Sequence, residues 1–213
     1  MSAKTRRLVL QGPAGLIEVL VDDPAPGHAQ APKGVVVVSH PHPLFGGTMD
    51  NKVVQTLARA FVLSGWSAVR FNFRGVGASE GSYDEGRGEL EDLLAVVAAH
   101  APEGPLALAG FSFGSFVTAH AVQSLQTHRA LQALVLVGTA ATRFEVCKVP
   151  ESLHERTLVV HGEVDDTVPL ADVLDWARPQ SLPVTVVPGG GHFFHGQLPL
   201  LRGLVVRHLQ SCS

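Results

Sequence analysis

The pentapeptide Gly110-Phe-Ser-Phe-Gly114 is the stretch of this sequence whose residue types and spacing point most directly to chemistry. It follows the apolar run 105–109 and precedes a segment of helical character, 115–126, so a strand should turn sharply into a helix here. Such a turn holds its central residue in a strained conformation with the side chain raised, and small residues two positions away let the neighbouring backbones pass. Ser112, at the centre of the motif, is therefore a candidate nucleophile.

A serine hydroxyl reacts well only when a base takes its proton, and a histidine serves best when a carboxylate holds it in one tautomer. Two later loops of the chain offer these groups. Asp165 lies in the segment 161–169 after one apolar run, and His192 follows three consecutive glycines after another. The order Ser112, Asp165, His192 is the one expected for a nucleophile on a strand-to-helix turn.

The sequence around these candidates predicts the elements that would position them. A hairpin of two strands, 7–11 and 16–21, precedes the β-branched run 34–39, which is typical of a strand buried on both faces. The further expected strands are 67–73, 105–109, 134–137, 157–161 and 184–187, and the expected helices are 51–64, 89–100, 115–126, 170–177 and 198–209. This alternation predicts a mostly parallel sheet with helices on both faces and functional groups in the loops at the carboxyl ends of its strands.

The composition favours a single globular domain over residues 1–213, because 46% of the residues are hydrophobic and 16% are charged. The formal net charge of −3 gives no indication of a nucleic-acid partner or of binding to an anionic membrane surface. The two cysteines, Cys147 and Cys212, fit a reducing compartment better than a disulfide scaffold. The start of the chain is basic but lacks the apolar stretch of a signal peptide, so we expect a cytoplasmic protein.

Five segments together resemble the α/β-hydrolases, and the resemblance runs from Val35 to the last expected helix. They are the pentapeptide around Ser112, the loops 40–47 and 73–81, the segment 161–165 and the pair Gly191-His192. Within that superfamily the chain is similar to small bacterial hydrolases related to dienelactone hydrolases and short-chain carboxylesterases. The resemblance implies an α/β-hydrolase fold with a mostly parallel, twisted sheet of about seven to eight strands and helices on both faces.

The resemblance also assigns roles, with Ser112 as the nucleophile, Asp165 as the acid and His192 as the base of a catalytic triad. The family pattern of His-Gly, two residues, Asp, two residues and Val-Pro falls on Asp165. Asp166 would then be a solvated loop carboxylate or a helix cap. His195, a short distance beyond His192, remains an alternative as the base or as a substrate contact.

By the same resemblance, the loop His40-Pro-His-Pro43 lies beside the nucleophile and gives one backbone N–H to an oxyanion hole. Phe113, directly after the nucleophile, gives the other N–H. Pro43 has no N–H to donate, so His42 is the first candidate in the loop and Leu44 is the second.

Two ligand-binding alternatives fit the sequence less well. A metal site could draw on His40, His42, His192 and His195, but no carboxylate or cysteine is spaced to complete it. The glycines of the segment 75–81 follow a strand, yet their spacing differs from that of a dinucleotide-binding loop. We therefore predict neither a metal nor a cofactor, and we expect Arg74 to fasten its loop through backbone carbonyls or else to contact substrate.

Phe111, Phe113, Phe193 and Phe194 lie next to the candidate nucleophile and base in the sequence. They either pack the core beneath the loops or make the substrate site apolar. The stretch 141–156 is too short for the lid domain that many members of the superfamily carry, which predicts a fold without a cap and disfavours a lipase.

These observations favour a serine hydrolase that cleaves small carboxylic esters or thioesters through an acyl-enzyme on Ser112. Two alternatives stay open. The same triad could hydrolyse amide, peptide or carbon–carbon bonds, or the chain could be a non-catalytic binding protein that retains the fold. The expected partner is a small-molecule acyl substrate, and the sequence leaves the oligomeric state open.

Overall fold

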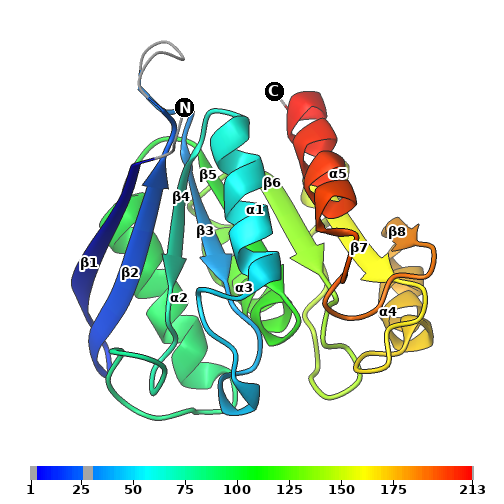
Figure 1. The fold of residues 1–213 in the computed structure, drawn as a ribbon, viewed down its shortest axis with the longest axis horizontal. Coiled ribbons are helices and arrows are strands. Elements are labelled where there is room, and N and C mark those ends of the chain that lie inside the picture. Colours follow the sequence, from blue (N-terminus) through cyan, green and yellow to red (C-terminus); the bar gives the residue numbers. More distant parts are fainter. Residues whose placement is uncertain (1–3, 26–30, 213) are drawn as a thin grey trace.

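The computed structural model describes residues 4–25 and 31–212, and the strands of this part join one eight-stranded sheet in the order β1-β2-β4-β3-β5-β6-β7-β8 (Figure 1). The strands are β1 Lys4–Gly12, β2 Gly15–Asp23, β3 Val35–Ser39, β4 Ser67–Phe71, β5 Leu106–Phe111, β6 Leu131–Val137, β7 Thr157–Gly162 and β8 Val184–Val187. The α-helices are α1 Lys52–Leu63, α2 Arg87–His100, α3 Phe113–Leu125, α4 Leu170–Ala177 and α5 Leu198–Ser211. The 3₁₀ helices are η1 Pro43–Phe45, η2 Glu151–Arg156 and η3 Arg178–Gln180.

The sheet is mostly parallel, as the sequence predicted. β1 and β2 form the expected hairpin, and β2 also runs antiparallel to β4. All the other neighbouring strands pair in parallel. The carboxyl ends of the parallel strands therefore share one edge of the sheet, and the loops that follow them gather at the bottom of Figure 1.

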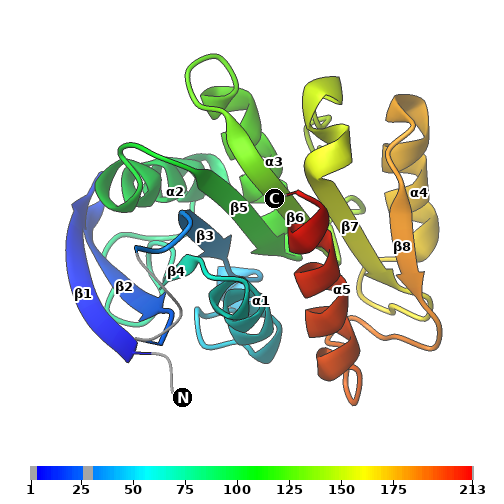
Figure 2. The same ribbon diagram turned by 90° about the horizontal axis from the view of Figure 1, so that it is seen from above.

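Helices cover both faces of the sheet, with α1 and α5 on one face and α2, α3 and α4 on the other (Figure 2). β3 lies between the two layers of helices, which explains why its residues are apolar at consecutive positions. Val37 belongs to the core under α2 and α3, whereas Val36 and Val38 belong to the core under α1 and α5. Successive side chains of a strand point to opposite faces, so a strand covered on both sides buries residues at consecutive positions, as β3 does from Val36 to Ser39.

Local hydrogen bonds set where two of the helices begin. α1 begins at Lys52 because the Asn51 side chain accepts the N–H of Val53 at 2.9 Å. α2 begins at Arg87, slightly before the expected position, since the Glu89 carboxylate accepts the N–H of Gly86 at 2.8 Å and stabilises the first turn.

No lid domain separates β6 from β7. The described connection, 138–156, carries the short 3₁₀ helix η2 and otherwise no helix or strand, which confirms the prediction from the stretch 141–156. In the described ranges, none of the helices has the length and apolar character needed to cross a membrane. The assignment of residues 1–213 to a single domain remains a prediction.

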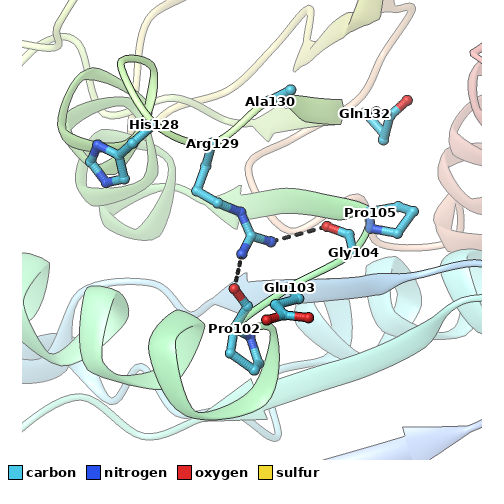
Figure 3. A pocket seen from close by; sticks show the side chains of 8 residues that line it. All are labelled: Pro102, Glu103, Gly104, Pro105, His128, Arg129, Ala130 and Gln132. Carbon is cyan, nitrogen blue, oxygen red and sulfur yellow. Dashed lines mark hydrogen bonds between the residues drawn. The ribbon is translucent and has the colours of Figure 1, made fainter.

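At the opposite edge of the sheet, the amino ends of β5 and β6 frame an open hollow of about 500 Å³ (Figure 3). Arg129 crosses it and donates hydrogen bonds to the carbonyl oxygens of Pro102 and Gly104. These bonds fasten the segment before β5 to the turn before β6. The hollow is separate from the candidate site, because the candidate residues follow the carboxyl ends of the strands.

Candidate active site

Ser112 occupies a sharp turn between β5 and α3, where the pentapeptide placed it. Its backbone has φ 57° and ψ −119°, a strained conformation for a residue with a side chain. Close packing explains the two glycines. A Cβ on Gly110 would lie 2.5 Å from the carbonyl oxygen of Gly114, and a Cβ on Gly114 would lie 2.4 Å from that of Ser39.

Ser115 locks this turn to the neighbouring strand. Its hydroxyl donates to the carbonyl oxygen of Gly110 at 2.8 Å and accepts the N–H of Val137 at 3.1 Å. The N–H of Ser112 donates to the carbonyl oxygen of Val137 at 2.8 Å. The sequence places Ser115 at the start of the expected helix 115–126 and does not reveal this role, because its partner Val137 lies on a strand that is distant along the chain.

Ser112, His192 and Asp165 form a continuous chain of hydrogen bonds, and all three are buried. The hydroxyl oxygen of Ser112 lies 3.0 Å from Nε2 of His192, and Nδ1 of His192 lies 2.7 Å from Oδ2 of Asp165. An ionised carboxylate only accepts hydrogen bonds, so the proton of the neutral ring is on Nδ1. Nε2 is then free to accept the proton of the serine hydroxyl.

The second oxygen of Asp165 is held by the backbone that follows it. Oδ1 accepts the N–H of Thr167 at 2.9 Å and the N–H of Val168 at 2.8 Å. Burial alone would raise the pKa of Asp165, but the hydrogen bonds from His192 and from the Val168 amide hold that pKa below its ordinary value. Asp165 is therefore an anion at neutral pH and keeps His192 in one orientation.

The two alternative residues, Asp166 and His195, lie outside the hydrogen-bonded series of Ser112, His192 and Asp165. Asp166 is exposed and accepts a hydrogen bond from the Thr167 hydroxyl at 3.3 Å. His195 is also exposed, and its ring lies 6.0 Å from that of Phe193. The contacts with Ser112 and Asp165 belong to His192, so the geometry favours Asp165 over Asp166 and His192 over His195.

Two backbone N–H groups next to the turn are available to bind an oxyanion. Phe113 is the first residue of α3, so its N–H has no partner within the helix. In the loop 40–47, the N–H of Leu44 is taken by Nδ1 of His42 at 3.2 Å. Within the described residues the N–H of His42 has no hydrogen-bond partner, which favours His42 over Leu44 as the second donor.

His40 is fully buried and fastens the loop 40–47 to the end of β4. Its Nδ1–H donates to the carbonyl oxygen of Pro41 at 2.6 Å, and its Nε2 accepts the N–H of Phe73 at 3.0 Å. Burial lowers the pKa of His40 to about 4, although the bond to Pro41 opposes the shift. Both nitrogens of the neutral ring are occupied, and the described residues bring no three metal-binding side chains together.

Arg74 corrects one expectation, because its side chain binds carboxylates and not backbone carbonyls. Its guanidinium donates hydrogen bonds to Asp92 at 2.8 and 3.1 Å and to Glu91 at 3.2 Å. The backbone N–H of Arg74 also donates to Asp92, at 2.9 Å. Hydrogen bonding to Asp92 raises the pKa of Arg74 above its ordinary value. The fork of a guanidinium matches a carboxylate, and this one joins the loop after β4 to α2. Its bonds to α2 direct Arg74 away from a substrate role.

Comparison with known proteins places the chain in a family. Residues 30–146, more than half of the chain, match the family described as serine aminopeptidase S33. The chain belongs to this family. The α/β-hydrolase fold predicted from the sequence is confirmed, and the protein is a serine hydrolase of that fold.

Relatives of this serine hydrolase come from several bacteria. The structure of an α/β serine hydrolase without a lid from Xanthomonas campestris has 38% sequence identity, covers 97% of this chain and 94% of that chain, and has a TM-score of 0.86. The structure of an α/β serine hydrolase homologue from Coxiella burnetii has 40% sequence identity, covers 96% of this chain and 97% of that chain, and has a TM-score of 0.81. An uncharacterized protein of Rickettsia prowazekii is 28% identical over 205 residues, which are 88% of this chain and 82% of the relative.

The phenylalanines near the site of this lidless hydrolase divide into two kinds. Phe111, Phe113 and Phe194 are fully buried and pack in the core. Phe193 is 43% exposed, and its ring stands edge-on to His192 with 5.1 Å between the ring centroids. His192 therefore has an apolar and partly open neighbour.

Proposed function

We propose that the chain hydrolyses small carboxylic esters or thioesters through an acyl-enzyme on Ser112. The hydroxyl oxygen of Ser112 attacks the carbonyl carbon while Nε2 of His192 takes its proton. The N–H groups of His42 and Phe113 stabilise the oxyanion, and His192 then protonates the leaving alcohol or thiol. Water that loses a proton to His192 releases the acid. Asp165 orients His192 throughout and stabilises its cation.

One observation carries this proposal: the hydrogen-bonded chain from Ser112 through His192 to Asp165 starts at a strained turn. A serine with only a structural role has no need of a buried base that is itself aligned by a buried carboxylate. The same observation weakens the alternative of a non-catalytic binding protein, because all three side chains are present and connected.

Hydrolysis of a peptide or amide bond is the second candidate, because the family is described as serine aminopeptidase S33. An amine is a poorer leaving group than an alcohol or a thiol, so this reaction depends more strongly on proton delivery by His192. The triad would be the same in both reactions, and in carbon–carbon bond hydrolysis. A panel of aryl esters, thioesters, aminoacyl anilides and vinylogous diketones would separate these reactions.

The decisive experiment measures hydrolysis of p-nitrophenyl acetate and butyrate by the wild type and by Ser112→Ala. We expect the variant to lose nearly all activity, and we expect a fluorophosphonate probe to label the wild type only. Ser124→Ala is the matched control, since Ser124 is an exposed serine on α3. Undiminished turnover in Ser112→Ala would refute the mechanism.

A small-molecule acyl substrate and a cytoplasmic location are further parts of the proposal. Both cysteines, Cys147 and Cys212, are free thiols, which fits a reducing compartment. Fractionation of cells that express the protein, followed by immunodetection, tests the location.

A further inference from the structure

Four ring side chains from three loops form an aromatic wall beside the proposed oxyanion donors: His42, Phe45, Tyr83 and Phe144. The ring of His42 is central, with centroid distances of 4.7 Å to Phe45, 4.9 Å to Tyr83 and 5.9 Å to Phe144. The His42 ring also lies 4.9 Å from that of Phe113, which directly follows the nucleophile. The aromatic wall therefore begins next to the reacting serine.

The aromatic wall is open to solvent at its outer end. Phe45 is 73% exposed, and His42, Tyr83 and Phe144 are half-buried. Grouped apolar side chains at the surface of a soluble protein are typical of binding sites. Aromatic rings favour stacking or edge contacts with planar groups, and the exposed ring of Phe45 offers such a contact at the outer end of the wall.

Arg143 places a positive charge at this outer end. Its guanidinium carbon lies 5.7 Å from the centroid of the Phe45 ring. Burial lowers the pKa of His42, and the charge of Arg143 lowers it further. Arg143 is exposed, and no carboxylate of the described residues lies within ion-pair distance of it. A guanidinium without a carboxylate partner is well suited to bind a carboxylate in two hydrogen bonds.

The aromatic wall is separate from the rings that surround His192. His192 must deliver a proton to the leaving group, so the leaving group lies near its ring. That ring contacts Phe111 at 4.9 Å and Phe193 at 5.1 Å, and among the described rings no contact joins these residues to the wall. An acyl group that extends away from the ring of His192 would run towards the wall.

We propose that the acyl group of the substrate is a planar aromatic ring that carries a carboxylate at the end away from the ester bond. The ring stacks on the aromatic wall, and the carboxylate binds Arg143. This inference rests on the proposed acyl-enzyme at Ser112 and adds the class of substrate to it. Water adds to the acyl carbonyl carbon, the bond to the serine oxygen breaks, and the released acid carries two carboxylates.

The test compares two p-nitrophenyl esters of nearly equal shape, the 4-carboxybenzoate and its neutral amide, the 4-carbamoylbenzoate. For the wild type we expect kcat/KM to be about 10- to 100-fold higher for the charged ester, the range of a charge-assisted hydrogen bond. The preference, measured as the ratio of the two kcat/KM values within each variant, should disappear in Arg143→Ala and reverse in Arg143→Glu. Arg207→Ala, at an exposed arginine on α5, is the matched control and should keep the preference.

The outcomes separate this inference from the proposed function. Equal kcat/KM for the two esters in the wild type, or a preference that survives Arg143→Glu, would overturn the inference while turnover of p-nitrophenyl acetate upholds the esterase. Absence of turnover with every ester would refute the proposed function. Calorimetric binding of terephthalate to Ser112→Ala gives a readout without turnover, and the additional change Arg143→Ala should weaken that binding.

Discussion

Replacing Asp165 with asparagine should disable His192 as a base without disturbing the fold. Oδ1 of Asp165 accepts the N–H groups of Thr167 and Val168, so the amide oxygen of the variant takes that position. The amide nitrogen must then face Nδ1 of His192 and donate to it. The ring is held in the tautomer with its proton on Nε2, which cannot accept the proton of Ser112.

The expected loss is about 10⁴-fold in kcat, the size that the equivalent change causes in a Ser-His-Asp triad of another fold. It corresponds to about 5.5 kcal/mol of activation free energy. KM should change little, because Asp165 is buried behind His192 and touches no substrate. The assay is steady-state hydrolysis of p-nitrophenyl butyrate at neutral pH, with the thermal unfolding midpoint as a check on the fold.

Asp166→Asn is the matched control, since it makes the same change at the adjacent, exposed carboxylate. It should keep kcat within about twofold of the wild type, as expected for a surface substitution away from the site. A loss of less than about tenfold in Asp165→Asn, with the fold intact, would refute this reasoning. An equal loss in the two variants would refute it as well.

Three further changes test the scaffold around the site. The pKa of His40 is about 4 in the folded protein and 6.5 when unperturbed, so protonation of the unfolded chain should remove about 3 kcal/mol of stability as pH falls between these values. Urea unfolding across this range should show a flatter pH dependence in His40→Gln, and an unchanged slope would contradict the assignment. Asp92→Ala leaves the buried Arg74 without its main partner and should cost about 3–5 kcal/mol in urea unfolding, whereas Glu91→Ala, at an exposed position, should cost less than about 1 kcal/mol. Gly114→Ala should reduce both the thermal midpoint and esterase activity, because its Cβ would lie 2.4 Å from a backbone carbonyl oxygen, and wild-type values for both would contradict this packing argument.

The order of strands and helices could be predicted from the sequence because periodicity, β-branched runs and glycines act locally. Boundaries shifted where a distant residue contributes. β5 continues to Phe111, beyond the expected end at Ala109, since Gly110 and Phe111 pair with Leu136 and Val137 of β6. The partner strand decides such an end, and sequence periodicity within one segment carries no information about it.

Similar reasoning explains what the sequence showed of the candidate site. The sequence limited the candidate triad residues to a few. It showed a serine between two glycines at a strand-to-helix turn, and an aspartate and a histidine after later strands. His42 was already the first candidate for the second oxyanion donor, and the structure adds that the N–H of Leu44 donates to Nδ1 of His42. The carboxylate partner of Arg74 was missed, since Asp92 lies on a helix that the sequence alone does not place against the loop.

The sequence by itself determined which serine is the candidate nucleophile, its strained turn and the order of the groups that follow it. These features depend on backbone preferences over a few residues and on chain order. The tertiary structure decided which groups meet. Packing of parallel strands brings the loops after β3, β4 and β6 to one edge, where His42, Tyr83 and Phe144 come into contact and Arg143 stands beside Phe45. Contacts between loops depend on the twist and stacking of the whole sheet, so local sequence cannot specify them.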